Sequence, residues 1–167
     1  ARFYREMIRK HGVKLHLETV ATVELIKKEK PDYIISAEGG EASLPPIEGI
    51  DDDNVLSAWD ILKNDPVTGD RIAVIGGGAV GIETAEFLAQ KGTIDPETLY
   101  FLFKYRAESD EKLHELISKG SKEVTIFDMA PKIGSGIGKS TKWILLGNIN
   151  NYGINVITSA EIISVKG

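Results

Sequence analysis

Apolar runs alternate with helically spaced apolar residues along the second half of the chain, and this alternation predicts an α/β fold. The apolar run at residues 72–75 is typical of a strand that is buried on both faces of a sheet. A helical pattern follows it up to Leu88, and further strands are predicted at 122–128 and 154–158. We therefore expect a parallel sheet with flanking helices.

The rest of the chain carries shorter patterns of the same two kinds. We expect the helix that begins at Ser57 to turn Trp59 and Leu62 inward. Ser140 or Thr141 is expected to cap the helix before the third strand. The other predicted elements are helices at 2–11 and 23–28 and strands at 13–17, 32–37 and 162–165.

The 28 residues 93–120 predict a helical hairpin, inserted between the glycine-rich helix and the next strand. Asp95 and Pro96 form a strong helix start, because Asp caps a helix and Pro suits its first position. Ser109 is expected to cap a second helix, which stops at Gly120. The hairpin departs from a simple doubly wound fold.

A glycine motif of the form Gly-x-Gly-x-x-Gly joins the first strand to its helix. In such a motif the first glycine allows the tight turn, the second lets the backbone approach a pyrophosphate, and the third lets the helix pack on the strand. The alternative is a glycine-rich turn that serves packing alone, which explains the spacing poorly. The order of strand, motif and helix predicts a Rossmann-type dinucleotide-binding domain. The expected phosphate-binding residues are Gly76, Gly77, Gly78, Ala79, Val80 and Gly81.

Asp128 is the expected ligand of the adenosine ribose. In a dinucleotide fold the next strand ends in an acid about 20 residues after the glycine motif. Asp128 lies 47 residues after Gly81, and removing the 28 inserted residues leaves 19. The loop residues Met129 and Lys132 complete this site, and Lys132 could tolerate a 2′-phosphate. The alternative is that Asp128 is an exposed acid at a strand end.

Composition excludes several classes of function. The chain has 167 residues and a net charge of −5, so we expect neither nucleic acid nor an anionic membrane as a partner. It has no cysteine, which excludes a disulfide, a redox dithiol and thiolate ligands within it. His11 and His16 lack partners at ligand spacing, so no metal site is expected. No apolar run approaches about 18 residues and no signal peptide is evident, so a cytoplasmic setting is the default.

Three stretches carry a resemblance to a known family. Residues 32–39 running into 45–50 are similar to a strand and proline linker that leave an FAD domain. The second stretch is the glycine motif at 76–83, and the third, at 134–143, is similar to a Gly-x-Gly-Lys-Thr-Thr-x-Trp stretch. Together they resemble the C-terminal region of 2,4-dienoyl-CoA reductases, enoate reductases and related multidomain NADH:flavin oxidoreductases of the old yellow enzyme class.

This resemblance implies a division of the chain and a role for each part. Residues 1–54 would be the trailing part of an FAD-binding domain and a linker, and residues 55–167 an NAD(H)-binding domain that is incomplete at its C-terminus. The intact protein would pass electrons from NADH through FAD and an iron–sulfur cluster to FMN, and then to a small activated alkene. The flavins and the cluster would belong to N-terminal domains missing from this sequence.

Two departures from the family pattern matter. Glu38 stands where the family has Thr, which places an acid near the expected FAD. Asp128 stands where dienoyl-CoA reductases carry basic residues, and an acid suits NADH rather than NADPH. Because hydride would move directly from nicotinamide to flavin, no catalytic residue is expected here, although Glu83 could approach the nicotinamide side.

Two other functions stay open. The chain could belong to another two-dinucleotide flavoprotein, of the NADH oxidase or disulfide reductase type. It could also be a non-catalytic nucleotide sensor, in which NADH moves the helical hairpin against a partner.

Overall fold

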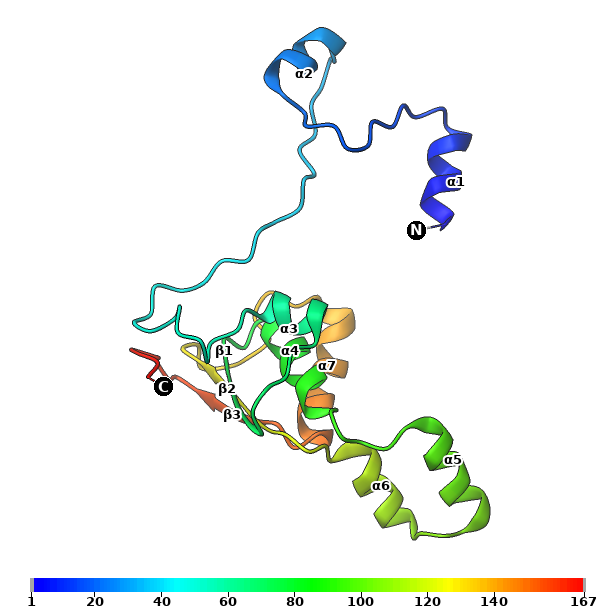
Figure 1. Ribbon diagram of the computed structural model, residues 1–167, viewed down its shortest axis with the longest axis vertical. Helices are drawn as coiled ribbons and strands as arrows, with labels where there is room; N and C mark the ends of the chain where they lie inside the picture. Colours follow the sequence, from blue (N-terminus) through cyan, green and yellow to red (C-terminus); the bar gives the residue numbers. More distant parts are fainter. Residues whose placement is uncertain (1, 167) are drawn as a thin grey trace. The chain divides into compact units, whose positions relative to one another are not determined.

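Three strands between residues 71 and 158 form a parallel sheet (Figure 1). The strands β1 (Arg71–Ile75), β2 (Glu123–Asp128) and β3 (Asn155–Thr158) lie side by side in that order. In the register of the sheet, Ile75 lies opposite Phe127. Because all three strands run in one direction, their carboxyl ends meet at one edge of the sheet, as the Rossmann-type prediction requires.

The computed structural model describes residues 2–166, which fall into two units that divide between Gly40 and Glu41. The second unit contains the sheet and includes the predicted linker that ends at Asn54. Within this unit the linker contacts the C-terminal stretch, because Val165 donates its N–H to the carbonyl oxygen of Glu48 at 2.8 Å.

Three helices, α3 (Ala58–Asn64), α4 (Ala79–Ala89) and α7 (Lys139–Asn151), lie on one side of the sheet (Figure 1). The strands supply alternate residues to the core under these helices, as a period of two residues dictates. The helices supply apolar residues to the same core. The most deeply buried side chains of this core are Ile82, Ala85, Leu88, Val124 and Ile126.

Burial on both faces, expected for residues 72–75, is wrong for β1 in the described structure. Val74 is buried under α4, whereas Ala73 is exposed and Ile75 is 38% exposed. Successive strand residues point to opposite faces, and only one face lies under α3, α4 and α7. Ile157 of β3, which is 45% exposed, adds an apolar residue to the exposed part of the sheet.

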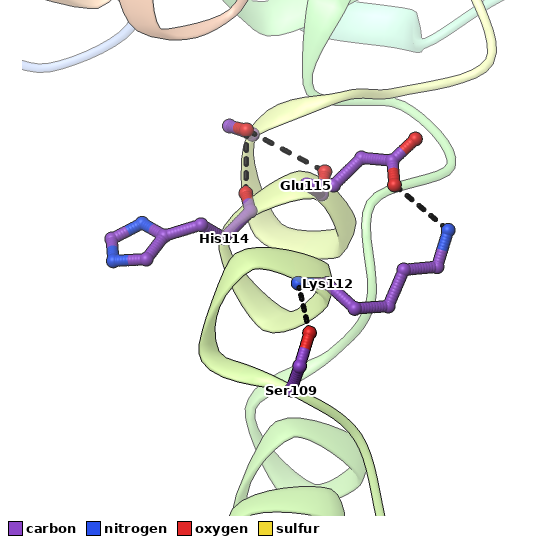
Figure 2. A network of polar contacts seen from close by, with 5 residues as sticks. Ser109, Lys112, His114 and Glu115 are labelled. Atoms are coloured by element: carbon purple, nitrogen blue, oxygen red, sulfur yellow. Dashed lines mark hydrogen bonds and ion pairs between the residues drawn. The ribbon is translucent and has the colours of Figure 1, made fainter.

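The predicted hairpin is present as helices α5 (Pro96–Tyr105) and α6 (Asp110–Ser118). The Asp95 carboxylate accepts the N–H groups of Glu97 at 2.9 Å and Thr98 at 3.0 Å, so the predicted cap is confirmed. Ser109 caps α6 in the same way, by accepting the N–H of Lys112 at 3.2 Å (Figure 2).

One turn of α6 carries a further set of polar contacts (Figure 2). Lys112 forms an ion pair with Glu115 at 2.8 Å, and this pairing lowers the pKa of the Glu115 carboxyl below its ordinary value. The Ser118 hydroxyl donates to the carbonyl oxygen of His114 at 2.5 Å. His114 itself is exposed, and these contacts are those of a solvated helix turn.

Two details of the predicted helices are wrong. In α3 the buried residue is Ile61, while Trp59 is 54% and Leu62 42% exposed. Helix α7 begins after Gly138, two residues before the expected cap at Ser140 or Thr141. The Gly138 carbonyl oxygen already accepts the N–H groups of residues 141 and 142, so the helix starts without a side-chain cap.

The first unit contains helices α1 (Arg2–Lys10) and α2 (Val23–Glu29), both of which the sequence predicts. The strands expected at 13–17 and 32–37 are absent from the described residues of this unit. Val13 and Ile35 are exposed by 55% and 89%, so their apolar side chains have no face to pack on. A strand needs a hydrogen-bonded partner, and residues 2–40 provide none.

The strand expected at 162–165 is reduced to one bridge, between Glu48 and Ser164. This bridge joins the linker to the C-terminal stretch within the second unit. Gly49 adopts a φ of +80° next to it, and a side chain there would collide with the Val165 carbonyl oxygen. The contact therefore depends on a glycine in the linker.

Candidate functional site

The glycine turn lies at the carboxyl end of β1 and leads directly into α4. Gly76 adopts a φ of +104°, a region that side chains rarely allow, and its N–H still donates to the Phe127 carbonyl oxygen at 2.8 Å. A Cβ on Gly81 would collide with the carbonyl oxygen of Gly76. The first and third glycines of the motif thus have the turn and packing tasks that the sequence predicts.

The start of α4 has donors that could hold a phosphate group. Gly78 is its N-cap and makes no side-chain capping bond, and the first helical hydrogen bond runs from the Ile82 N–H to the Gly78 carbonyl oxygen at 3.0 Å. The N–H groups before Ile82 therefore lie outside the helical ladder and carry its partial positive charge. A Cβ built on Gly78 would meet no atom within 4 Å, so the protein itself leaves space at this backbone.

Gly77 has a different environment from Gly78. It is buried, its carbonyl oxygen accepts the N–H of Gly134 at 2.6 Å, and its N–H donates to the Asp128 carboxylate at 2.5 Å. A Cβ on Gly77 would collide with Ile133 and lie 2.7 Å from the carboxylate. Gly77 therefore joins the glycine turn to the loop after β2, and its N–H is engaged within the protein.

Asp128 lies at the carboxyl end of β2, beside the glycine turn, as the spacing predicts. It is half-buried, and its second carboxylate oxygen accepts the N–H of Ala130 at 2.6 Å. The hydrogen bond from Gly77 was not evident from the sequence, because it joins residues that are 51 apart. Only the topology points to it, because neighbouring parallel strands end at the same edge of the sheet and so bring the residues after them close together.

Met129 and Lys132 lie on the loop that follows Asp128. Met129 is 71% exposed and Lys132 is exposed, so both are accessible at the same edge of the sheet.

The sequence analysis did not identify Lys142, whose half-buried side chain lies over Gly134 in this loop. A Cβ on Gly134 would lie 3.1 Å from Cε of Lys142 and 3.5 Å from its Nζ. The lysines within residues 134–143 were the feature of the sequence that could have pointed to Lys142.

Two cavities adjoin the start of α4. The larger, of about 880 Å³, runs along β1 and reaches Gly76, Gly78 and Val80. The smaller, of about 370 Å³, lies between the first turns of α4 and α7 and includes Glu83 and Thr141. Ala79 lines both cavities, so an extended ligand could pass the start of α4 and place a group in each.

Among residues 2–166, no cluster of three or more acidic or histidine side chains could hold a metal ion. No described helix is long and apolar enough to span a bilayer. The site combines helix N–H groups outside the helical ladder, a carboxylate at a strand end and two adjoining cavities. Helix N–H groups of this kind can bind an anion such as a phosphate.

Comparison with known proteins identifies a matching family and several relatives. Residues 23–167 match the family described as pyridine nucleotide-disulphide oxidoreductase. A metal reductase of Desulforamulus reducens is 35% identical over 159 residues, which are 93% of this chain and 24% of that protein. An NADH oxidase of Thermoanaerobacter brockii is 43% identical over 86 residues, which are 48% of this chain and 13% of that protein.

A solved structure is similar along nearly the whole chain. It is a 2-naphthoyl-CoA reductase in complex with 2-naphthoyl-CoA, at 29% identity and a TM-score of 0.66. The similarity covers 99% of this chain and 21% of that protein. The chain thus spans a quarter or less of these relatives, which are longer proteins. The chain belongs to the pyridine nucleotide-disulphide oxidoreductase family.

Proposed function

We propose that this chain binds NADH and delivers its hydride to a flavin, as part of a multidomain flavin oxidoreductase. One observation carries the proposal. The glycine turn and Asp128 lie together at one edge of a parallel sheet, joined by the hydrogen bond from Gly77. Ligands of open parallel sheets bind at this edge, and a glycine turn followed by a strand-end acid suits a dinucleotide.

The residues present fit NADH. The N–H groups of residues 78–81 would hold the pyrophosphate at the start of α4. An ionised carboxylate has about four acceptor positions, and the backbone occupies two of them at Asp128. The remaining positions would accept the ribose hydroxyls, while Met129 and Lys132 would lie beside the adenosine.

The chain's part in the reaction would be positioning. When bound, NADH supplies a hydride, which a flavin can accept directly. Asp128 and the glycine turn would fix one half of the nucleotide and so set where the other half lies. Glu83 is exposed on α4 and lines the smaller cavity, and we assign it no proton transfer.

The other electron carriers would be held outside these residues. Iron–sulfur clusters are usually bound by cysteine thiolates, and this chain has no cysteine. FAD, FMN and the cluster are therefore proposed to belong to flavin domains of the same longer protein. The lengths of the relatives support this, because they leave room for such domains.

The proposed final acceptor is an activated alkene of the dienoyl-CoA or enoate type. Similarity to the 2-naphthoyl-CoA reductase supports this class of acceptor. Similarity to the NADH oxidase supports an alternative, in which the electrons leave the flavin for oxygen. A disulfide acceptor is the third possibility, and the cysteine pair for it would lie outside this chain.

The binding step is tested by calorimetric titration of the purified chain with NADH, ADP-ribose and ATP. We expect NADH and ADP-ribose to bind at one site and to compete, and ATP to compete weakly. Absence of any NADH binding would contradict the proposal.

The electron acceptor is tested separately on the full-length protein, by following anaerobic NADH oxidation with an enoyl-CoA or a disulfide. Oxygen is tested as the acceptor in a parallel aerobic reaction.

A further inference from the structure

Helix α5 exposes more aromatic surface than a helix facing water normally does. The exposed fractions are 63% for Tyr100, 56% for Phe101, 66% for Phe103 and 61% for Tyr105. These side chains point to more than one side of the helix, whereas Leu99 and Leu102 are half-buried. A helix that is apolar around most of its circumference is usually covered by protein.

One side of α5 has a regular order of charged and aromatic residues. Glu97 and Lys104 are seven residues apart, so two helical turns place them on the same side. Tyr100 and Phe101 lie between them, and the Tyr105 ring packs against Phe101 with a centroid distance of 4.8 Å. This acid–aromatic–base stripe runs along the helix axis, with its acid at the N-terminal end.

Both charges of the stripe are available for a partner. Within the described residues, neither Glu97 nor Lys104 forms an ion pair. Nζ of Lys104 lies 5.7 Å from the centre of the Tyr100 ring and 5.3 Å from that of Tyr105. The lysine therefore lies over the aromatic surface, where a carboxylate from another molecule could reach it.

We propose that the stripe is a homodimer contact, in which α5 helices of two copies pack antiparallel around a two-fold axis. An axis between Tyr100 and Phe101 places Glu97 of each copy opposite Lys104 of the other. The same axis places Tyr100 of each copy opposite Phe101 of the other. A two-fold interface must be complementary to itself, and the order of charges in the stripe satisfies this condition.

The available area sets the strength of this contact. A buried aromatic side chain covers about 150–250 Å². Because more than half of each ring is exposed, the stripe offers on the order of 400 Å² per copy. Two copies would bury about 800 Å², which is below the roughly 1,200 Å² of stable complexes. The dimer should therefore be weak and should form in the micromolar range or above.

Two matched variants test whether the stripe carries the contact. Phe101 and Phe103 are both exposed phenylalanines, and a separation of two residues places them on nearly opposite sides of the helix. In sedimentation equilibrium, Phe101→Ser should weaken self-association of the purified chain at least tenfold. Phe103→Ser should leave it within about twofold. A monomeric wild type at about 1 mM, or equal effects of both variants, would overturn the proposal.

A charge exchange tests the antiparallel arrangement. Glu97→Lys alone and Lys104→Glu alone should each lose self-association, because each creates like-charged pairs at both ends of the contact. An equimolar mixture of the two variants should associate at least tenfold more tightly than either alone, since every pair is then opposite in charge. Circular dichroism of each variant checks that α5 is retained. A mixture that stays monomeric while both helices are intact would overturn the arrangement.

Discussion

The Asp128 carboxylate accepts the backbone N–H of Gly77 at 2.5 Å, across the carboxyl ends of two neighbouring strands. The proposed ribose ligand therefore also holds the turn that is proposed to bind the pyrophosphate. Bonds from backbone N–H groups to a carboxylate are among the stronger hydrogen bonds in proteins. The proposed ribose selection would thus be coupled to the shape of the glycine turn through the Asp128 side chain.

This coupling determines which variant can test cofactor choice. Asp128→Asn removes the charge and keeps one acceptor oxygen, at a cost of on the order of 1–3 kcal/mol in stability. A 2′-phosphate beside a carboxylate costs on the order of 1–4 kcal/mol, or about fivefold to nearly a thousandfold in affinity. We expect wild type to prefer NADH and Asp128→Asn to narrow the gap, mainly by improving NADPH binding.

The measurement is the ratio of NADH to NADPH affinity, because a ratio is less sensitive than either affinity to a general loss of stability. Glu123→Gln is the matched control, since it removes an exposed acid at the other end of the same strand. Lys132 acts in the opposite direction, and a lysine that reaches the phosphate would reduce the preference in wild type. A ratio that Asp128→Asn leaves unchanged would contradict the assignment of the ribose site.

Neighbouring glycines in the turn should differ in their effect on stability. Gly77→Ala places a methyl group against Ile133 and Asp128, and overpacking of this kind costs about 1–3 kcal/mol in the free energy of unfolding. Gly78→Ala meets no neighbouring atom and has an extended backbone with φ of −76°. Urea unfolding of both variants compares them directly. Equal destabilisation by both variants would show that packing around Gly77 does not hold the glycine turn against the loop after β2.

The start of α5 should weaken in acid. Hydrogen bonds from the backbone and side chain of Thr98 hold the pKa of the Asp95 carboxyl below its ordinary value. A folded-state pKa that is lowered contributes stability above the ordinary value, and this contribution is lost as the pH falls through the folded value. Asp95→Ala should therefore lower helicity at neutral pH, and the difference from wild type should vanish in acid. A difference that persists unchanged at low pH would rule out the cap as its cause.

The purified 167-residue chain should carry no stoichiometric flavin. Its described residues contain one glycine turn between a strand and a helix, which the proposal assigns to NADH. The first unit has two helices and no sheet among its described residues, so it offers no second turn of this kind. Visible absorbance of freshly purified protein is the measurement. A full flavin band would mean that the division between FAD and NADH regions is wrong.

The parts of the fold that the sequence predicts well are those set by local geometry. The glycine spacing, the Asp95 and Ser109 caps and the strand-end acid each follow from a short pattern with one physical reason. Subtracting the hairpin placed Asp128 correctly beside the glycine turn. The hydrogen bond that joins Asp128 to Gly77 could not be predicted, because it depends on how closely two loops approach.

The predictions that are wrong concern elements whose structure depends on contacts with other parts of the chain. The alternation at 13–17 resembles a strand, but the described residues of the first unit provide no neighbouring strand. In α3 the sequence could not distinguish Ile61 from Trp59, because both belong to a short helix whose rotation is set by packing on α4. Helix α7 begins directly after Gly138, earlier than predicted, because backbone hydrogen bonds rather than a hydroxyl group close its first turn.

Calorimetric titration of Gly78→Val with NADH tests the central claim most directly. A Cβ at Gly78 meets no protein atom within 4 Å, and the extended backbone with φ of −76° suits a β-branched residue, so the variant should fold. The same side chain would occupy the space in which the backbone is proposed to meet the pyrophosphate. We predict that the folded variant binds NADH at least about 100-fold more weakly than wild type, which corresponds to about 2.7 kcal/mol. Unchanged NADH affinity in a folded variant would contradict the account.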